Sequence, residues 1–233
     1  MMQVTLLFRV SSAAVLFGSL AFAQTGFPFQ DESLHYSVQW PSGLSLGEAS
    51  LTARHSTDGW KFDFTMNAGI PGFDVKDHVR SSANQDLCSV ELNRNTSHGS
   101  RKSEEKTTFD YSKGTATRVT LNGGGTTEMP ISGCARDALD FLYFGRRELG
   151  QGRVPPGQNV FFGSSYAVRM EYTGAQTIKV NDQPEQTDRL VVYLKGPSSN
   201  VSFEVFYARD PARTPLLIRL PLAMGTFSME LVR

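Results

Sequence analysis

Three features that often announce a function are scarce in this sequence: cysteine, histidine and an excess of charge of one sign. The 23 Lys and Arg residues balance the 23 Asp and Glu residues, so the chain lacks the basic excess typical of nucleic-acid-binding proteins. Two cysteines without a neighbouring histidine do not supply the four N or S ligands of a structural zinc site. We therefore expect no nucleic-acid partner, no metal and no cofactor.

Long hydrophobic runs are also scarce, and the one present lies near the start of the chain. Residues 10–22 are apolar or small throughout, Arg9 precedes them, and Ala21-Phe22-Ala23 fits the small-x-small rule for signal peptidase. The run is shorter than the roughly 20 residues of a membrane span, which disfavours the alternative of a membrane anchor. The sequence therefore predicts a signal peptide over residues 1–23, a periplasmic or secreted mature chain, and no transmembrane segment after cleavage.

The predicted export changes the interpretation of Cys88 and Cys134. In an oxidising compartment a lone pair of cysteines most simply forms a disulfide, and two buried free thiols are the alternative. A Cys88–Cys134 bridge would close a loop of about 45 residues and stabilise the fold by about 4 kcal/mol in the chain-entropy model.

Alternation with a period of two dominates the rest of the chain. Trp60, Phe62 and Phe64 alternate with Lys61 and Asp63, as in a β-strand with one buried face. The same alternation recurs near residues 34–40, 88–92, 166–172, 201–207, 216–222 and 227–231. Because no long polar linker interrupts it, we expect residues 24–233 to form a single β-rich domain.

Local irregularities in this alternation predict how the sheet bends. Leu46 lies on an even position, whereas Ala49 and Leu51 lie on odd positions, so the inward face changes parity at a bulge near Gly47. Bulges bend strands, and the pattern therefore favours a curved antiparallel sheet, a barrel or a half-barrel.

Turn residues and charges complete the strand pattern. Asp58-Gly59, Thr173-Gly174 and Asn181-Asp182 are typical of tight turns between strands. The charges of residues 101–106 alternate in sign, which predicts an exposed edge strand.

One segment has helical spacing, and it predicts a single α-helix near residues 135–149. Ser132 is a candidate N-cap, Asp137 suits the N-terminal dipole, and Gly150 can end the helix. Phe141 and Phe144 point away from the main apolar stripe, so the helix has two apolar sides. It is either buried between a sheet and a loop, or it places an aromatic rim over a cavity mouth.

Residues 43–47 match G-x-S-x-G, the nucleophile elbow of α/β-hydrolases, with Ser45 as the nucleophile. That motif requires a strand before the serine and a helix after it. Here the strand pattern continues through Ala49 and Leu51, so a turn followed by a bulge is the preferred interpretation, and a serine hydrolase is a remote alternative.

Several segments, taken in order, resemble a family of exported bacterial proteins catalogued as domain of unknown function 3108. They are residues 32–40 (ESLHYSVQW), 46–51 (LGEASL), 137–143 (DALDFLY), 166–170 (YAVRM) and 225–231 (GTFSMEL). Asp31 stands where the family usually has Gly, and the two cysteines are not part of its pattern. The resemblance implies an envelope location and a β-rich fold, and it carries no agreed catalytic residue. A further likeness to the lipid- and lipoprotein-carrying half-barrels of the periplasm concerns the fold alone.

These observations favour a non-enzymatic envelope protein that holds an apolar ligand, such as a lipid or a lipoprotein acyl chain, in a β-sheet cavity. The candidate lining residues are Trp40, Trp60, Phe62, Phe64, Phe141, Phe144, Tyr166, Met170, Phe203, Phe227 and Met229. The same side chains could instead form a plain packed core. The alternative function is a structural or protein-interaction module of the envelope without a ligand, and the sequence specifies no oligomeric state.

Overall fold

The computed structural model describes residues 31–232 apart from residues 71, 198, 223 and 224. The predicted signal peptide, residues 1–23, lies outside the described residues. Within them, no helix is both long enough and apolar enough to span a bilayer.

The described residues form a single curved sheet and a single helix, which confirms the predicted β-rich class. The elements are β1 (Glu32–Gln39), β2 (Ser45–Ser56), β3 (Gly59–Ile70), β4 (Phe73–Ala83), β5 (Ser89–His98), β6 (Arg101–Asp110), β7 (Thr115–Thr120), β8 (Thr126–Pro130), β9 (Arg136–Asp137), α1 (Ala138–Gly150), β10 (Gln158–Phe161), β11 (Ser165–Val180), β12 (Gln183–Lys195), β13 (Asn200–Ala208), β14 (Pro215–Leu222) and β15 (Gly225–Leu231). All neighbouring strands are antiparallel except β9 and β10.

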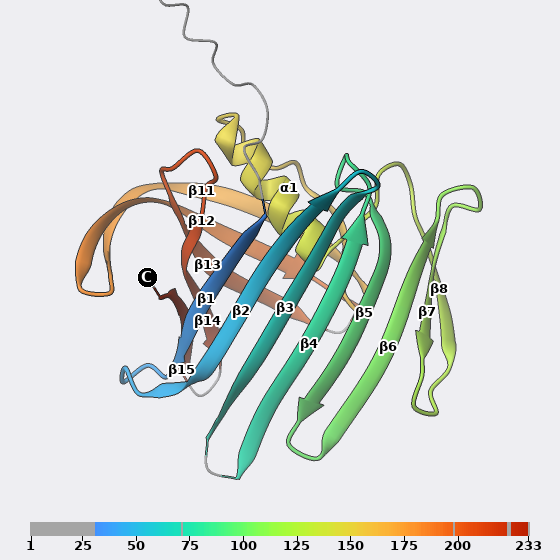
Figure 1. Ribbon diagram of the computed structural model, residues 1–233, viewed down its shortest axis with the longest axis horizontal. Helices are drawn as coiled ribbons and strands as arrows, with labels where there is room; N and C mark the ends of the chain where they lie inside the picture. The colour runs from blue at the N-terminus through green and yellow to red at the C-terminus, as the bar shows by residue number, and fades with distance from the viewer. Residues whose placement is uncertain (1–30, 71, 198, 223–224, 233) are drawn as a thin grey trace, which may run out of the picture.

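The strands form two meanders that meet in the middle of the sheet. In the first meander, β1 to β8 lie side by side in chain order, and β8 forms one edge of the sheet. In the second meander, β9 to β15 lie side by side in chain order, and β9 forms the other edge. Tyr36 of β1 pairs with Leu231 of β15. Figure 1 shows β1–β8 on the near side and β11–β14 behind them, so the sheet curves around a concave interior.

The predicted bulge at Gly47 is confirmed. Val38 pairs with Gly47 and Gln39 pairs with Ser45, so Leu46 is the extra residue. Gly47 has a φ of +150°, and a Cβ there would lie 2.1 Å from the carbonyl oxygen of Asn67. No larger residue fits this bend, because the neighbouring strand approaches too closely.

Two other local predictions have opposite outcomes. Asn181 and Asp182 have left-handed φ values of 48° and 61° and form the predicted two-residue turn between β11 and β12. The predicted turn at Thr173-Gly174 is wrong. The pairing of β11 with β12 shifts between Tyr172 and Gly174, so this dipeptide forms a bulge inside one long strand.

The predicted edge strand at residues 101–106 is also wrong. These residues belong to β6, which pairs with β5 on one side and β7 on the other, while β8 and β9 are the edges. Two of these charges have partners on the neighbouring strand: Lys106 lies 2.8 Å from Glu91, and Glu105 lies 2.7 Å from Arg94. Cross-strand ion pairs therefore account for the charges at Glu105 and Lys106.

The helix α1 begins after Asp137, which replaces the predicted Ser132 as N-cap: its carboxylate accepts the backbone N–H groups of Leu139 and Asp140. The helix contacts β3, β4, β9 and β10. Figure 1 shows it at one end of the concave interior. Both apolar sides of the helix are buried, since Phe141 and Phe144 are 8% and 7% exposed.

Candidate functional site

The concave interior contains an elongated apolar cavity in two adjoining parts. An inner part of about 310 Å³ lies under α1, and an outer part of about 510 Å³ extends to the opposite end of the sheet. Phe203, Ile218 and Met229 line both parts. Each volume falls within the range of about 300–1,000 Å³ that is usual for ligand sites.

Strand residues with inward parity and one face of the helix form the inner part. Phe64, Met170 and Phe203 contribute from β3, β11 and β13, and Phe141 from α1 closes it at the top. Tyr36 also lines it, but its hydroxyl donates to the carbonyl of Pro215 at 3.0 Å, so its polar atom is already engaged. The inner wall therefore presents almost only carbon to its contents.

The outer part has its mouth among the turns at the opposite end. Trp40 and Phe227 form an edge-to-face pair there, with ring centroids 4.7 Å apart. Phe73, which is 46% exposed, also belongs to the mouth. The titratable lining residues are Asp77 and His98, whose side chains lie 2.7 Å apart. Polar groups thus gather at the entrance and not in the depth.

The structure divides the predicted lining residues into two groups. Those that line the cavity are Trp40, Phe64, Phe141, Met170, Phe203, Phe227 and Met229. Those that lie elsewhere are Trp60, Phe62, Phe144 and Tyr166.

Each residue of the second group packs against a specific neighbour. The ring of Phe62 stacks between Trp60, at 6.0 Å, and Tyr143 of the helix, at 4.2 Å. Phe144 lies beneath the guanidinium of Arg136, 3.8 Å from its ring centre, and so does not form a rim. Tyr166 packs its ring against Gly196.

A buried acidic pair lies where the helix begins. Asp137 and Asp140 are fully buried, and the hydroxyls of Ser81 and Ser89 each lie within hydrogen-bond distance of both carboxyl groups. Burial raises the pKa of Asp137. Burial, and then the charge of Asp137, raises the pKa of Asp140 well above its usual value. Since Asp137 accepts the backbone N–H groups of the helix, we assign the charge to Asp137 and the proton to Asp140.

A buried ion pair holds the other part of the helix. The Arg146 side chain is fully buried and pairs with both carboxylate oxygens of Glu32, while its Nε donates to the carbonyl of Ala212 at 3.0 Å. Tyr143 donates to the same carboxylate at 2.7 Å. Burial raises the pKa of Tyr143 far above its usual value, so it remains a neutral donor.

Cys88 and Cys134 form a disulfide with Cα atoms 4.9 Å apart, as predicted. It connects the start of β5 to the segment that precedes β9. Beside it, Tyr111 donates to the carbonyls of Ser89, at 2.7 Å, and Ala135, at 3.2 Å. Burial raises the pKa of Tyr111 to about 12.

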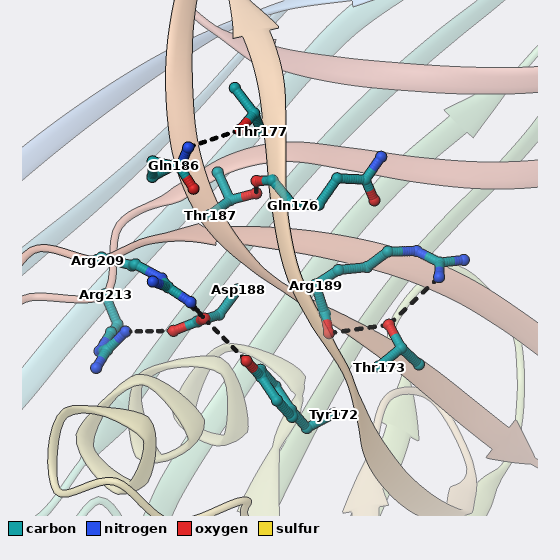
Figure 2. A network of polar contacts seen from close by, with 10 residues as sticks. All are labelled: Tyr172, Thr173, Gln176, Thr177, Gln186, Thr187, Asp188, Arg189, Arg209 and Arg213. Carbon is teal, nitrogen blue, oxygen red and sulfur yellow. Dashed lines mark hydrogen bonds and ion pairs between the residues drawn. The ribbon is translucent and has the colours of Figure 1, made fainter.

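A separate charged network lies on β11, β12 and the connection from β13 to β14. Figure 2 shows Asp188 between Arg209, Arg213 and Tyr172. Arg209 and Arg213 donate to its two carboxylate oxygens at 2.9 and 2.6 Å. None of these four residues lines the apolar cavity.

The remaining candidate residue lies outside the cavity. Ser45 is exposed and is the first residue of β2, so a strand and not a helix continues from it. Across the described ranges, no three His, Cys, Asp or Glu side chains gather closely enough to hold a metal ion.

Sequence reasoning missed Phe162 and Ile218 as lining residues, and it missed two arginines of the concave face, Arg94 and Arg118. The parity of β5 contained a signal for Arg94, because it lies two positions after the inward Leu92.

Comparison with known proteins supports the fold and the family. The family described as "Protein of unknown function (DUF3108)" matches residues 35–232. A search of curated proteins found no match. Among solved structures, the crystal structure of a β-barrel-like protein of domain of unknown function DUF1849 from Brucella abortus is similar, with a TM-score of 0.64 and 8% sequence identity. The match covers 89% of this chain and 98% of that chain. At this identity the likeness concerns the fold alone.

Proposed function

The chain belongs to the DUF3108 family of proteins of unknown function, and from the geometry of its interior we propose that it is a binding protein or carrier for the acyl chain of a lipid. In this proposal it acts in the periplasm without catalysing a reaction. The proposal depends on one observation: the cavity walls are almost entirely apolar, and the titratable side chains Asp77 and His98 line the outer part and not the inner part.

An apolar occupant suits this cavity better than water does. A buried water molecule needs two to four polar partners, and the inner wall has few polar atoms to provide them. An aliphatic chain would exchange contact with water for contact with Phe64, Met170 and Phe203, which is favourable by about 0.8 kcal/mol per buried methylene.

The length of the cavity suits a long chain. Phe64 lines the inner part and Ile70, six residues further along β3, lines the outer part. At a rise of about 3.3 Å per residue these positions lie about 20 Å apart along the strand. With bonds of about 1.5 Å, an extended hydrocarbon advances about 1.3 Å per carbon, so about 15 carbons cover that distance.

A pair of variants on one strand tests the proposal. Ala68 lines the outer cavity, whereas its neighbour Asn67 faces outward and is exposed. Ala68→Phe places a ring in the cavity, and Asn67→Phe places the same ring on the opposite face.

The measurement is extraction of detergent-free protein from the periplasm, followed by mass spectrometry of the bound lipids. We expect acyl lipid with the wild type and with Asn67→Phe, and little or none with Ala68→Phe. Wild-type protein that carries no lipid and does not bind a fluorescent fatty acid would contradict the proposal. A purely structural or interaction role would then be favoured.

A further inference from the structure

The concave face changes character abruptly between β4 and β5. Residues directly opposite one another on neighbouring antiparallel strands project from the same face of a sheet. One such row crosses β2 to β6, and its members in order are Leu51, Phe64, Val79, Arg94 and Glu105. The first three line the inner cavity. Arg94 and Glu105 continue the row beyond the lining residues, so charged side chains lie next to the apolar wall.

The charged part of this face contains two arginines and one glutamate. Arg94 lies 2.7 Å from Glu105, and Arg118 of β7 lies 3.9 Å from the other oxygen of the same carboxylate. The three side chains are only 14–26% exposed. Because one carboxylate faces two guanidinium groups, the cluster carries one uncompensated positive charge.

Both arginines retain donor capacity. The Nε atoms of Arg94 and Arg118 are buried, and neither has a hydrogen-bond acceptor among the residues that the structure describes. The other nitrogens of Arg118 donate to the carbonyl of Gly163 and, at 3.1 Å, to the hydroxyl of Thr127. A buried charged donor without an acceptor is costly, so the cluster has both the charge and the N–H groups for a further anionic acceptor.

Phe162 connects this cluster to the cavity. Its ring lies 4.0 Å from the guanidinium carbon of Arg94 and also lines the inner part of the cavity. Phe162 therefore links the cavity wall to the cluster, and Arg94 lies one side chain away from the apolar lining.

We propose that Arg94 and Arg118 bind the singly charged oxyanion, a carboxylate or a phosphodiester, of a lipid whose acyl chain occupies the apolar cavity. The proposal rests on the function proposed above and adds a preference for acidic lipids. One negative charge balances the cluster, and the planar guanidinium matches the oxygen pairs of both oxyanions.

The network of Figure 2 supplies a matched control. It also has one carboxylate, Asp188, between two arginines, and the Nε of Arg213 is buried without an acceptor among the described residues. Neither cluster lines the cavity itself, and the difference is that the Arg94 cluster is connected to the cavity through Phe162, whose ring lies against Arg94 and lines the inner part. Arg213→Gln therefore removes an arginine from a similar setting away from the lipid.

The test measures the affinity of the delipidated full chain for four ligands: hexadecanoate, lysophosphatidylglycerol, hexadecanol and inorganic phosphate. We expect an acidic lipid to bind at least about 10-fold more tightly than hexadecanol. Arg94→Gln and Arg118→Gln should each weaken that lipid by about 10- to 100-fold and leave hexadecanol unchanged. Arg213→Gln should change neither, and inorganic phosphate should bind weakly because it lacks the chain.

The outcomes separate this inference from the function on which it rests. Equal binding of acidic and neutral chains, unaffected by the arginine variants, would overturn the oxyanion site and leave the acyl-chain site standing. Inorganic phosphate binding as tightly as hexadecanoate would also overturn it, because the site would then serve free anions. Failure of every chain to bind would reject both.

A variant that keeps both arginines makes the test independent of their structural role. Glu105→Gln raises the charge of the cluster by one unit and leaves Arg94 and Arg118 in place. We expect it to tighten binding of the acidic lipids several-fold without changing hexadecanol binding. An unchanged or weaker affinity for the acidic lipids would contradict the proposal, even if the arginine variants failed to fold.

Discussion

The two ends of the concave interior are built on different principles. At the end occupied by α1, polar groups are buried and matched to partners: Arg146 to Glu32, and Asp137 and Asp140 to two serine hydroxyls. At the opposite end, apolar side chains such as Ile70 and Phe227 surround an open volume. At the helix end the polar groups are matched within the protein, whereas the open end leaves unfilled apolar surface, where the proposed acyl chain would lie.

The largest expected effect comes from breaking the buried ion pair at the helix end. Glu32→Gln removes the carboxylate that faces the fully buried Arg146 side chain, and we expect a loss of about 3–5 kcal/mol of unfolding free energy in urea titrations. The control is Glu171→Gln, whose partner Arg169 is 60% exposed, with an expected loss below about 1 kcal/mol. Equal losses in the two variants would show that the buried ion pair at the helix end does not stabilise the fold more than an exposed pair does.

Removal of the disulfide should have the next largest effect. The double change Cys88→Ala and Cys134→Ala should lower the unfolding free energy by about 2–4 kcal/mol, because the reduced unfolded chain regains the entropy of a long loop. Wild-type protein in reductant should unfold at the same urea concentration as the variant. Coincident unfolding of the oxidised wild type and the variant would contradict this expectation.

The acidic pair predicts a dependence on pH. The folded chain keeps the proton of Asp140 above the usual carboxyl pKa of 3.8, whereas the unfolded chain releases it. Stability should therefore fall as pH rises from about 4 towards the raised pKa, by at most about 1.4 kcal/mol per pH unit. Asp140→Asn removes this proton, so its stability relative to the wild type should rise with pH. A difference that is constant from pH 4 to pH 8 would refute the protonated carboxyl.

The smallest effect on stability is expected at the open end. Phe227→Ala removes the edge-to-face contact with Trp40, and we expect thermal unfolding to report a loss of only about 1 kcal/mol. Affinity for a fluorescent fatty acid should fall in the same variant, since both rings line the mouth. A large loss of stability with unchanged affinity would reverse the assigned roles of the two ends.

Much of the fold could be predicted because side-chain parity along a strand is a local property. The bulge at Gly47 and the inward faces of β3 and β13 follow from it. The pairing of distant strands does not follow from parity, since parity does not specify which strand is the neighbour. For the same reason the charges of residues 101–106 suggested an edge, although two strands flank them.

The site could be predicted only in part, because inward parity does not say what an inward side chain meets. Phe62 and Phe64 share a face of β3, yet Phe62 stacks on Tyr143 of the helix and Phe64 lines the cavity. The helix placement that separates them depends on tertiary packing. Arg94 has inward parity as well, but a charged residue at an inward position carries no meaning until Glu105 and Phe162 are seen beside it.

The pairing of β1 with β15 constrains the order of assembly. Each meander consists of hairpins between consecutive strands, which can form as soon as their residues are available. The β1–β15 ladder joins segments from opposite ends of the described chain, so the entropy cost of closing the loop between them is large. We therefore expect this ladder to form late in folding. Until then β1 and β15 each present an unpaired edge lined with apolar residues, the condition under which intermediates aggregate. Until β1 and β15 pair, the strands that later form the centre of the sheet are therefore open to intermolecular pairing during folding.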